Sequence, residues 1–257
     1  SVGYLGEMPD FRQLENPKTN FASEIISSDN KMLGKYYFND NRTPISFDEI
    51  NTKTVEALIA IEDERFYSHP GIDLKATIRA IVFLNTRGGA STISQQLARQ
   101  LFVGVRSRNI FQAIIQKIKE WVIAVKLEKQ YTKEEIITMY LNIYDFGYYG
   151  DGIKSASNIY FSKEPKELNI EESAMLVGML QNSSYYDPFR RAEITKNRRN
   201  LVFNQMEKNG FISTKEKDSL KNLPLELNYN PQSHRRGLAT YFRSYLRGFM
   251  KDWTSKN

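Results

Sequence analysis

Glu62 is the residue of this sequence best suited to move a proton. Apolar residues recur at the three- and four-residue spacing of one helix face, at Val55, Leu58, Ile59 and Phe66. Glu62 falls on that face, where a leucine would fit the pattern. An apolar setting favours the neutral form of a carboxyl group, which suits a group that takes up and returns a proton. The alternative is a solvated acidic cluster, 62–64, at the end of a helix that the turn at 69–71 closes.

A second carboxylate, Glu120, lies on a helix whose sequence is apolar on two faces. One face is formed by Phe111, Ile114, Ile115, Ile118, Val122 and Val125. The other face carries Ala124 and Leu127 beside Glu120. A helix that is apolar on both sides is expected to be mostly buried. With Lys117 three residues earlier, Glu120 is either half of a structural ion pair or a functional carboxylate.

Cations and glycines between these two carboxylates predict an anion site. A glycine pair ending at Gly89 precedes a helix start, where Thr92 and Gln95 have the spacing of a capping box. Helix starts of this kind bind anions, and Arg99 lies close in the sequence. The alternative is a capped helix after a turn.

Arginine and lysine residues alternate with apolar residues just before Glu120. Arg106, Arg108 and Lys117 lie among Phe102, Ile110 and other apolar side chains. This pattern suits a segment that dips into anionic lipid headgroups, and it also suits a solvated helix face.

Composition restricts the classes of function. The chain has 257 residues, enough for one large domain or two small ones, and a net charge of +6 that favours an anionic partner. It has no cysteine and only two histidines, His69 and His234, so no thiolate or histidine metal site is expected. No apolar run is long enough to span a bilayer.

The elements that must position these residues are mostly helices. Two β-prone runs flank a Ser-Asp-Asn turn over 24–38 and predict a hairpin. Helical periodicity dominates from residue 46, with a capping box at Thr132 and Glu135 and a further helix around 171–180. A loop at 231–237 precedes the last helix, which has an apolar face and a basic face. We expect this helix to pack into the core. The alternatives are docking on a neighbouring domain or on a membrane.

In their order along the chain, these clusters resemble the five signature motifs of the family 51 glycosyltransferases, the peptidoglycan glycosyltransferase domains of class A penicillin-binding proteins and their monofunctional relatives. The first motif is matched by Glu62, Asp63, Phe66, His69 and Gly71. The second motif is matched by Gly89, Ser91, Thr92, Ile93, Gln95 and Gln96. The third is matched by Lys117 and Glu120, and the last two fall within 140–161 and 172–188.

The chain departs from the family pattern in its cations. Gln116 stands where the third motif has arginine, and Arg99 stands where the family commonly has lysine. The segment 99–117 is also a few residues longer than usual, so the sequence leaves open whether Arg106 or Arg108 contacts a phosphate.

The resemblance implies a mainly α-helical, lysozyme-like fold with a head lobe and a smaller jaw lobe at about 84–129. It divides the chain into a lead-in and β-hairpin after a membrane anchor (1–45), the glycosyltransferase domain (46–230) and a helix toward a transpeptidase domain (231–257).

The resemblance also implies a reaction. The 4-hydroxyl of an acceptor lipid II attacks a glycan strand linked to polyprenyl pyrophosphate, with inversion, on the outward-facing side of the cell membrane. Glu62 is the expected base, and Glu120 is the second catalytic carboxylate. The expected substrate-binding residues are Asp63, Phe66, His69, Ser91, Thr92, Gln95, Gln96, Arg99, Arg106, Arg108 and Lys117. No cofactor is required, and a Mg or Mn ion could bridge the pyrophosphate.

Two other functions fit part of the sequence. A lysozyme-like glycan-cleaving enzyme would also use Glu62 but needs no cationic clamp for pyrophosphate. A non-catalytic module that binds anionic lipid or nucleic acid explains the net charge but not two carboxylates on apolar helix faces. The cations Arg99, Arg106, Arg108 and Lys117 favour the transferase.

Overall fold

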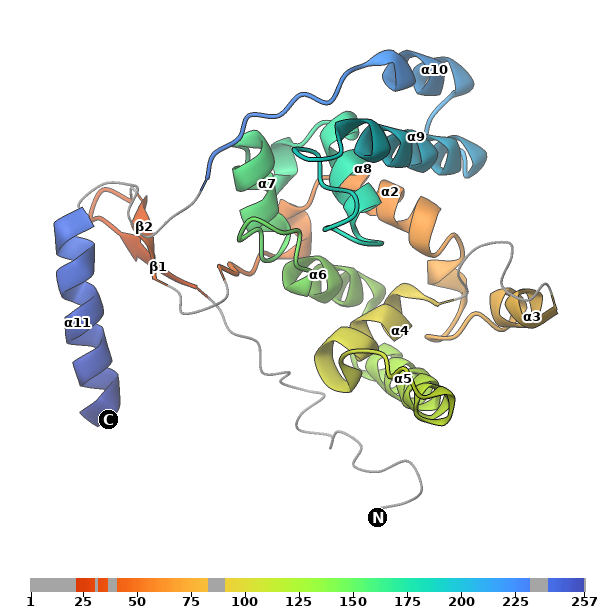
Figure 1. The fold of residues 1–257 in the computed structure, drawn as a ribbon, viewed down its shortest axis with the longest axis horizontal. Helices are drawn as coiled ribbons and strands as arrows, with labels where there is room; N and C mark the ends of the chain where they lie inside the picture. The colour runs from red at the N-terminus through yellow and green to blue at the C-terminus, as the bar shows by residue number, and fades with distance from the viewer. Residues whose placement is uncertain (1–21, 31, 37–40, 83–90, 232–239, 257) are drawn as a thin grey trace.

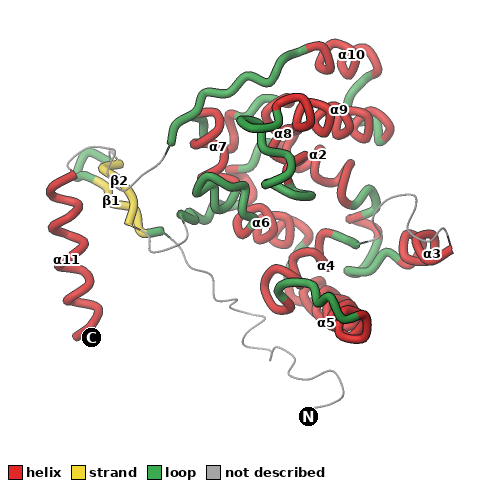
Figure 2. Tube along the Cα trace, viewed as in Figure 1, coloured by secondary structure: helices red, strands yellow, loops and turns green. Residues whose placement is uncertain are grey.

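The computed structural model describes residues 22–30, 32–36, 41–82, 91–231 and 240–256. Over these residues the chain is mainly helical and has one small antiparallel sheet (Figures 1 and 2), which confirms the fold class expected from the sequence. The helices are α2 (Thr52–Glu62), α3 (Leu74–Val82), α4 (Ile93–Ala98), α5 (Ile110–Gln130), α6 (Lys133–Ile143), α7 (Ile153–Phe161), α8 (Ile170–Met179), α9 (Ala192–Lys208), α10 (Thr214–Asn222) and α11 (Thr240–Lys256). The short helical turns are η1 (Phe47–Glu49), η2 (Phe66–Ser68), η3 (Arg99–Val103) and η4 (Pro165–Glu167).

The helical body consists of two groups of helices. In the first group α8 packs on α2 and α9, and α10 packs on α9; in the second, α4 packs on α5 and α6 (Figure 1). The centre of the first group is α8, whose buried side chains include Met175, Leu176 and Val177. The centre of the second is the short helix α4, which buries Ile93 and Leu97 completely. The buried side chains of both groups belong to one hydrophobic core, and both groups contribute to the cleft described below.

The predicted hairpin is present. Strand β1 (Ser23–Ile26) pairs with β2 (Met32–Tyr36), and the turn between them contains Asn30 with a φ of 59°. Asparagine tolerates this left-handed backbone better than most residues.

Helix α11 lies beside the hairpin and apart from the helical body (Figure 1). Its apolar side chains are between 48% and 66% exposed, at Phe242, Tyr245, Phe249 and Trp253. The prediction that this helix packs into the core is therefore wrong. The loop expected before it lies outside the described residues except for Pro231.

The helix that carries Glu62 ends earlier than the sequence pattern suggests. Helix α2 stops at Glu62, and the backbone of Asp63 leaves the helical region, with a φ of −160° and a ψ of 73°. Phe66 still reaches the core, but it does so from the separate turn η2. The prediction that one helix runs on to the turn at 69–71 is wrong, because Asp63 uses its side chain to bind other segments.

Helix α5 is buried on only one of its two apolar faces. Glu120, Ile123, Ala124 and Leu127 are buried against the second group of helices. The opposite face is exposed, with Ile110, Phe111 and Ile114 each more than half accessible and Ile115, Ile118 and Val122 partly so. The prediction of a mostly buried helix is therefore wrong, because no described element covers that face.

Local capping sets several helix starts. Thr132 and Glu135 form the predicted capping box at the start of α6. At α4, Thr92 accepts a hydrogen bond from the backbone N–H of Gln95 at 3.2 Å. The Gln95 side chain does not complete that box, because its oxygen accepts a hydrogen bond from Lys117 instead. The helix predicted around 171–180 is α8, which runs from Ile170 to Met179.

Candidate active site

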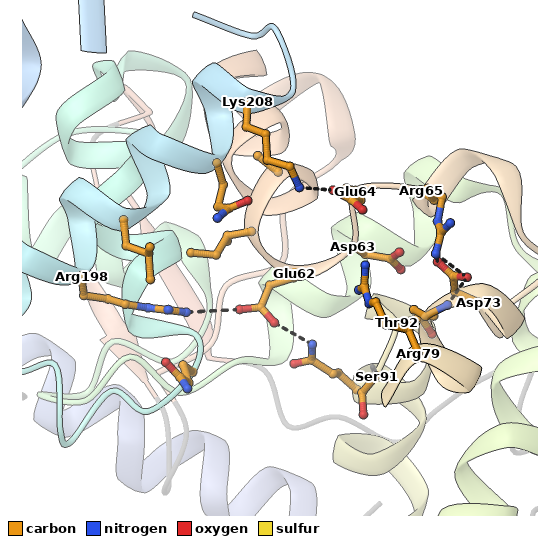
Figure 3. A pocket seen from close by; sticks show the side chains of 17 residues that line it. Glu62, Asp63, Glu64, Arg65, Asp73, Arg79, Ser91, Thr92, Arg198 and Lys208 are labelled. Atoms are coloured by element: carbon orange, nitrogen blue, oxygen red, sulfur yellow. Dashed lines mark hydrogen bonds and ion pairs between the residues drawn. The ribbon is translucent and has the colours of Figure 1, made fainter. Parts of the chain in front are cut away.

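A cleft of about 680 Å³ opens between the two groups of helices. Its walls come from the end of α2 and the residues after it, from α3, from the start of α4 and from one face of α9 (Figure 3). Charged and amide side chains dominate this lining, including Glu62, Asp63, Glu64, Arg65, Asp73, Arg79, Gln96, Gln181, Arg198, Gln205 and Lys208. The cleft is thus suited to a polar, charged substrate.

Glu62 lies at the wall of this cleft in a polar setting. Gln96 Nε2 donates a hydrogen bond to its Oε2 at 2.8 Å, and a guanidinium nitrogen of Arg198 lies 3.8 Å from its Oε1. Its side chain is 14% exposed. The expected apolar environment of Glu62 is therefore wrong, because α2 ends at Glu62 and turns the carboxylate away from the apolar face and into the cleft. A carboxylate that is held at one oxygen and open to the cleft can still accept a proton.

Asp63 joins the first motif to the start of α4. Both of its oxygens lie 3.0 Å from His69 Nε2, and Oδ2 also accepts a hydrogen bond from the backbone N–H of Ile93 at 3.1 Å. His69 Nδ1 accepts from the backbone N–H of Gly71, so Nε2 carries the proton and donates to Asp63. Both side chains are buried. This network fixes the segment that follows Glu62.

Phe66 and His69 lie beneath the cleft and do not line it. Phe66 is completely buried, and the Lys133 ammonium lies 4.2 Å from the centre of its ring. Lys133 also donates to the carbonyl oxygen of His69 and pairs with Glu128. The structure thus holds these two predicted substrate-binding residues in contacts within the protein.

Gly71 allows the backbone that follows η2 to pack directly against the backbone of α5. Its φ is +95°, and a Cβ atom at this position would lie 2.9 Å from both the carbonyl carbon and the oxygen of Ala124. Because the colliding atoms are helix backbone, they cannot move aside as a flexible side chain would.

We therefore expect Gly71→Ala to lower the free energy of unfolding by about 3 kcal/mol, through backbone strain and this collision. Gly210→Ala is the matched control, since Gly210 also has a positive φ of +77° but no atom within 4 Å of the place that a Cβ would occupy. That change should cost only about 1 kcal/mol. Chemical denaturation of both variants measures the difference, and equal losses would contradict the close approach to α5.

A second cluster surrounds Lys117 on α5. Its ammonium group donates to Ser91 Oγ at 2.8 Å and to Gln95 Oε1 at 3.2 Å, and it pairs with Glu120 at 2.8 Å. Glu120 is buried, whereas one third of the Lys117 side chain is exposed. The ion pair that the sequence allowed is therefore present.

Helix α4 connects the two carboxylate clusters. Gln95 contacts Lys117, and the next residue, Gln96, contacts Glu62. Ser91 belongs to both places, because it accepts from Lys117 and lines the cleft. Thr92 also lines the cleft, and its hydroxyl donates to the carbonyl oxygen of Gly71. The start of α4 thus brings Glu62 and the Lys117–Glu120 pair to one region of the protein.

The three predicted arginines are not gathered at the cleft. Arg99 begins η3 and is half-buried, and its charge acts on Tyr140. Arg106 and Arg108 are exposed in the segment that leads to α5, and neither lines the cleft.

The contacts of Gln116 with the segment before α5 explain why a glutamine occupies this position. Its oxygen accepts from the backbone N–H of Ser107 at 2.7 Å, and its nitrogen donates to the carbonyl oxygen of Val105 at 3.0 Å. A side-chain amide can satisfy a donor and an acceptor at once, which a guanidinium group cannot. Gln116 therefore fixes the backbone on both sides of Arg106.

Sequence reasoning missed the cations that line the cleft from other elements. Arg198 on α9 approaches Glu62 while its Nε donates to the carbonyl oxygen of Gly178, and its guanidinium lies 5.4 Å from the Tyr186 ring. Arg79 on α3 and Lys208 at the end of α9 also line the cleft (Figure 3). The adjacent pair Arg198-Arg199 is the only sequence signal for Arg198, and a pair of arginines on a helix is ordinarily solvated.

The described part of the chain contains neither a metal cluster nor a membrane-spanning helix. No group of three or more histidine, aspartate or glutamate side chains there could hold a metal ion. In the same part of the chain, none of the helices combines the length and the apolar character needed to cross a bilayer.

Comparison with known proteins gives consistent matches. A family model described as Transglycosylase matches residues 29–207. Penicillin-binding protein 1F of Bacillus subtilis is 35% identical over 91% of this chain, and penicillin-binding protein 1A of Escherichia coli is 32% identical over 87%. Penicillin-binding protein 1A of Aquifex aeolicus is 31% identical over 95%. The crystal structure of penicillin-binding protein 1A from Haemophilus influenzae matches 91% of the chain with a TM-score of 0.47 and 20% identity, and 24% of that structure is covered.

The chain spans only part of these relatives. It covers 32% of the Bacillus protein, 26% of the Escherichia protein and 33% of the Aquifex protein.

Proposed function

Because the chain belongs to the transglycosylase family, the family 51 glycosyltransferases, we propose that it is a peptidoglycan glycosyltransferase that polymerises lipid II into glycan strands. The observation that carries this proposal is that adjacent residues of α4 contact both groups: Gln96 donates to the Glu62 carboxylate at the cleft, and Gln95 accepts from Lys117. The reaction needs both a base and positive charge, and α4 contacts both.

Glu62 is the general base in this proposal. The acceptor 4-hydroxyl attacks the anomeric carbon of the donor, a new glycosidic C–O bond forms, and the bond to the pyrophosphate oxygen breaks with inversion. Glu62 takes the hydroxyl proton and later releases it to water. The hydrogen bond from Gln96 fixes one carboxylate oxygen, which leaves the other for the proton.

Lys117 stabilises the departing pyrophosphate. Its ammonium group carries the positive charge of the cluster, its side chain is partly exposed, and the buried Glu120 holds the ammonium group in position. Charge placed in advance where negative charge develops is commonly the largest contribution to catalysis. A Mg or Mn ion would add positive charge at the leaving pyrophosphate, and Glu120 is the carboxylate of the Lys117 cluster that would hold it.

In this proposal Phe66 and His69 have a structural role and do not contact the substrate. They hold the segment after Glu62 against α4 and α5, through Asp63 and Lys133. Asp63, Ser91, Thr92 and Gln96 remain available to the substrate because they line the cleft, whereas Gln95 is completely buried and acts through its contact with Lys117.

The exposed apolar face of α5 supports a membrane surface as a partner. This face, formed by Ile110, Phe111, Ile114, Ile115, Ile118 and Val122, lies next to the exposed Arg106 and Arg108. Apolar side chains flanked by arginines suit the boundary between acyl chains and anionic headgroups. We propose that this face rests on the outward-facing side of the cell membrane, where the lipid-linked substrate resides. We also propose a transpeptidase domain in cis as a partner, as the family resemblance implies.

A glycan-cleaving enzyme remains the main competing function. It would use a carboxylate such as Glu62 but would gain nothing from Lys117 and its partners. Incubating the protein with lipid II tests the proposal: we expect glycan polymer on a gel. Absence of polymer together with cleavage of added glycan strands would overturn it in favour of a hydrolase.

A further inference from the structure

Glu62 is connected to a completely buried tyrosine on another helix. Tyr140 of α6 donates a hydrogen bond from its hydroxyl to Gln96 Oε1 at 2.9 Å, and Gln96 Nε2 donates to Glu62 Oε2 at 2.8 Å. Tyr140 has no exposed surface, so it cannot touch a substrate. The three side chains come from α2, α4 and α6, and thus join the two groups of helices at the cleft.

The direction of these hydrogen bonds is fixed by chemistry. An ionised carboxylate only accepts, so Gln96 must present its NH₂ group to Glu62 and its oxygen to Tyr140. Burial, and next the negative charge of Glu62, raise the pKa of Tyr140 well above its ordinary value, so the phenol keeps its proton and remains a donor. If the Gln96 amide turned over, its NH₂ would face the Tyr140 hydroxyl, and its oxygen would face the carboxylate.

We propose that Tyr140 is a positioning residue for the catalytic base, acting through Gln96. It locks the Gln96 amide in the orientation that donates to Glu62. The carboxylate is thereby held in one orientation, with Oε2 bound to Gln96 and Oε1 on the side of Arg198. This inference rests on the proposed function, in which Glu62 removes the acceptor proton.

The orientation of the Gln96 amide matters because few other groups position the Glu62 carboxylate. Arg198 approaches Oε1 only at 3.8 Å, which is beyond hydrogen-bond distance. Glu62 is also the last residue of α2, where the free carbonyl groups carry partial negative charge. Among the described residues, Gln96 is the group that hydrogen-bonds this carboxylate.

Tyr140→Phe tests the proposal because it removes only the hydroxyl. We expect kcat for lipid II polymerisation to fall about tenfold with little change in KM, the factor expected for one lost hydrogen bond that orients the base. The matched control is Tyr160→Phe on α7. Tyr160 is equally buried, and its hydroxyl donates to the carbonyl oxygen of Phe146 at 2.7 Å, away from the cleft. The control should lose comparable thermal stability and keep the wild-type kcat.

A double-mutant cycle shows whether Tyr140 acts through Gln96. Gln96→Met alone should also lower kcat, and adding Tyr140→Phe to it should lower kcat less than about twofold further. Independent losses that multiply would overturn the proposal, as would an equal kcat in Tyr140→Phe and Tyr160→Phe.

Two further outcomes can be told apart from a failure of the proposed role of Tyr140. If the wild-type protein forms no polymer, the proposed function fails, and the role of Tyr140 is not tested. If Tyr140→Phe does not fold, Gln96→Met decides alone, because an unchanged kcat in that variant removes the link between Gln96 and the base.

Discussion

Glu62→Gln is expected to abolish detectable polymer formation from lipid II, lowering the rate about 100-fold to 10,000-fold while the protein remains folded. A glutamine side chain has nearly the same shape and can accept a hydrogen bond from Gln96, but it cannot take up the proton of the acceptor hydroxyl. Loss of general base catalysis typically costs between about 100-fold and 10,000-fold. The measurement is the amount of glycan polymer formed over time, with circular dichroism to verify the fold.

Glu64→Gln is the control for this experiment. Glu64 lines the same cleft and lies two residues away, but its carboxylate is paired with Lys208 at 3.1 Å. We expect Glu64→Gln to keep most of the activity, since exposed ion pairs contribute little. Polymerisation by Glu62→Gln at the wild-type rate would show that another group is the base.

The sequence predicts those parts of the fold that depend on neighbouring residues. The hairpin turn, the capping box at Thr132 and Glu135, and the i, i+3 pair of Lys117 and Glu120 are all present. Each of these depends on a few consecutive residues, so spacing alone specifies it.

The environment of Glu62 could not be predicted in this way. The apolar spacing of α2 is real, since Val55, Leu58 and Ile59 are buried. The helix nevertheless ends at Glu62, because Asp63 turns to bind His69 and the backbone of Ile93, which is thirty residues away. A helix pattern contains no information about such a distant partner.

The arginines of α9 show the same limit. Arg198 and Arg199 are adjacent in sequence, yet Arg198 faces the cleft and Arg199 is buried. Arg199 donates to the carbonyl oxygens of Leu223 and Pro224 at 2.7 and 2.8 Å, and so secures the chain after α10. Successive residues on a helix point about 100° apart, but which direction is the core depends on the packing of α8 and α9.

The burial of α5 differs from the prediction for a related reason. Two apolar faces normally mean two packed neighbours, and the described chain supplies a neighbour for only one of them. An apolar face that nothing covers is unusual for a protein surface and often marks an interaction site. The sequence pattern therefore predicts correctly that both faces of α5 are apolar. It does not tell what covers the exposed face, and the membrane surface is inferred from the proposed function.

Lys117→Met is expected to lower kcat/KM for polymerisation about 100-fold to 1000-fold. Removing one donor from a site where negative charge develops typically has an effect of this size. The Lys117 ammonium group is the cation of the cluster formed with Ser91, Gln95 and Glu120, and in the proposed reaction it exchanges one of these partners for an oxygen of the leaving group. Lys126→Met is the control, because Lys126 is an exposed lysine of the same helix that is not part of the cluster formed by Lys117, Ser91, Gln95 and Glu120.

The loss in Lys117→Met could also arise from the buried Glu120 carboxylate left without its partner, which is a purely structural effect. The double variant Lys117→Met, Glu120→Gln separates the two causes, because it removes the stranded charge together with the cation. If Lys117 only neutralises Glu120, the double variant should regain activity. If Lys117 stabilises the departing pyrophosphate, the double variant should recover thermal stability and remain as slow as Lys117→Met, because no other group of the cluster carries a positive charge.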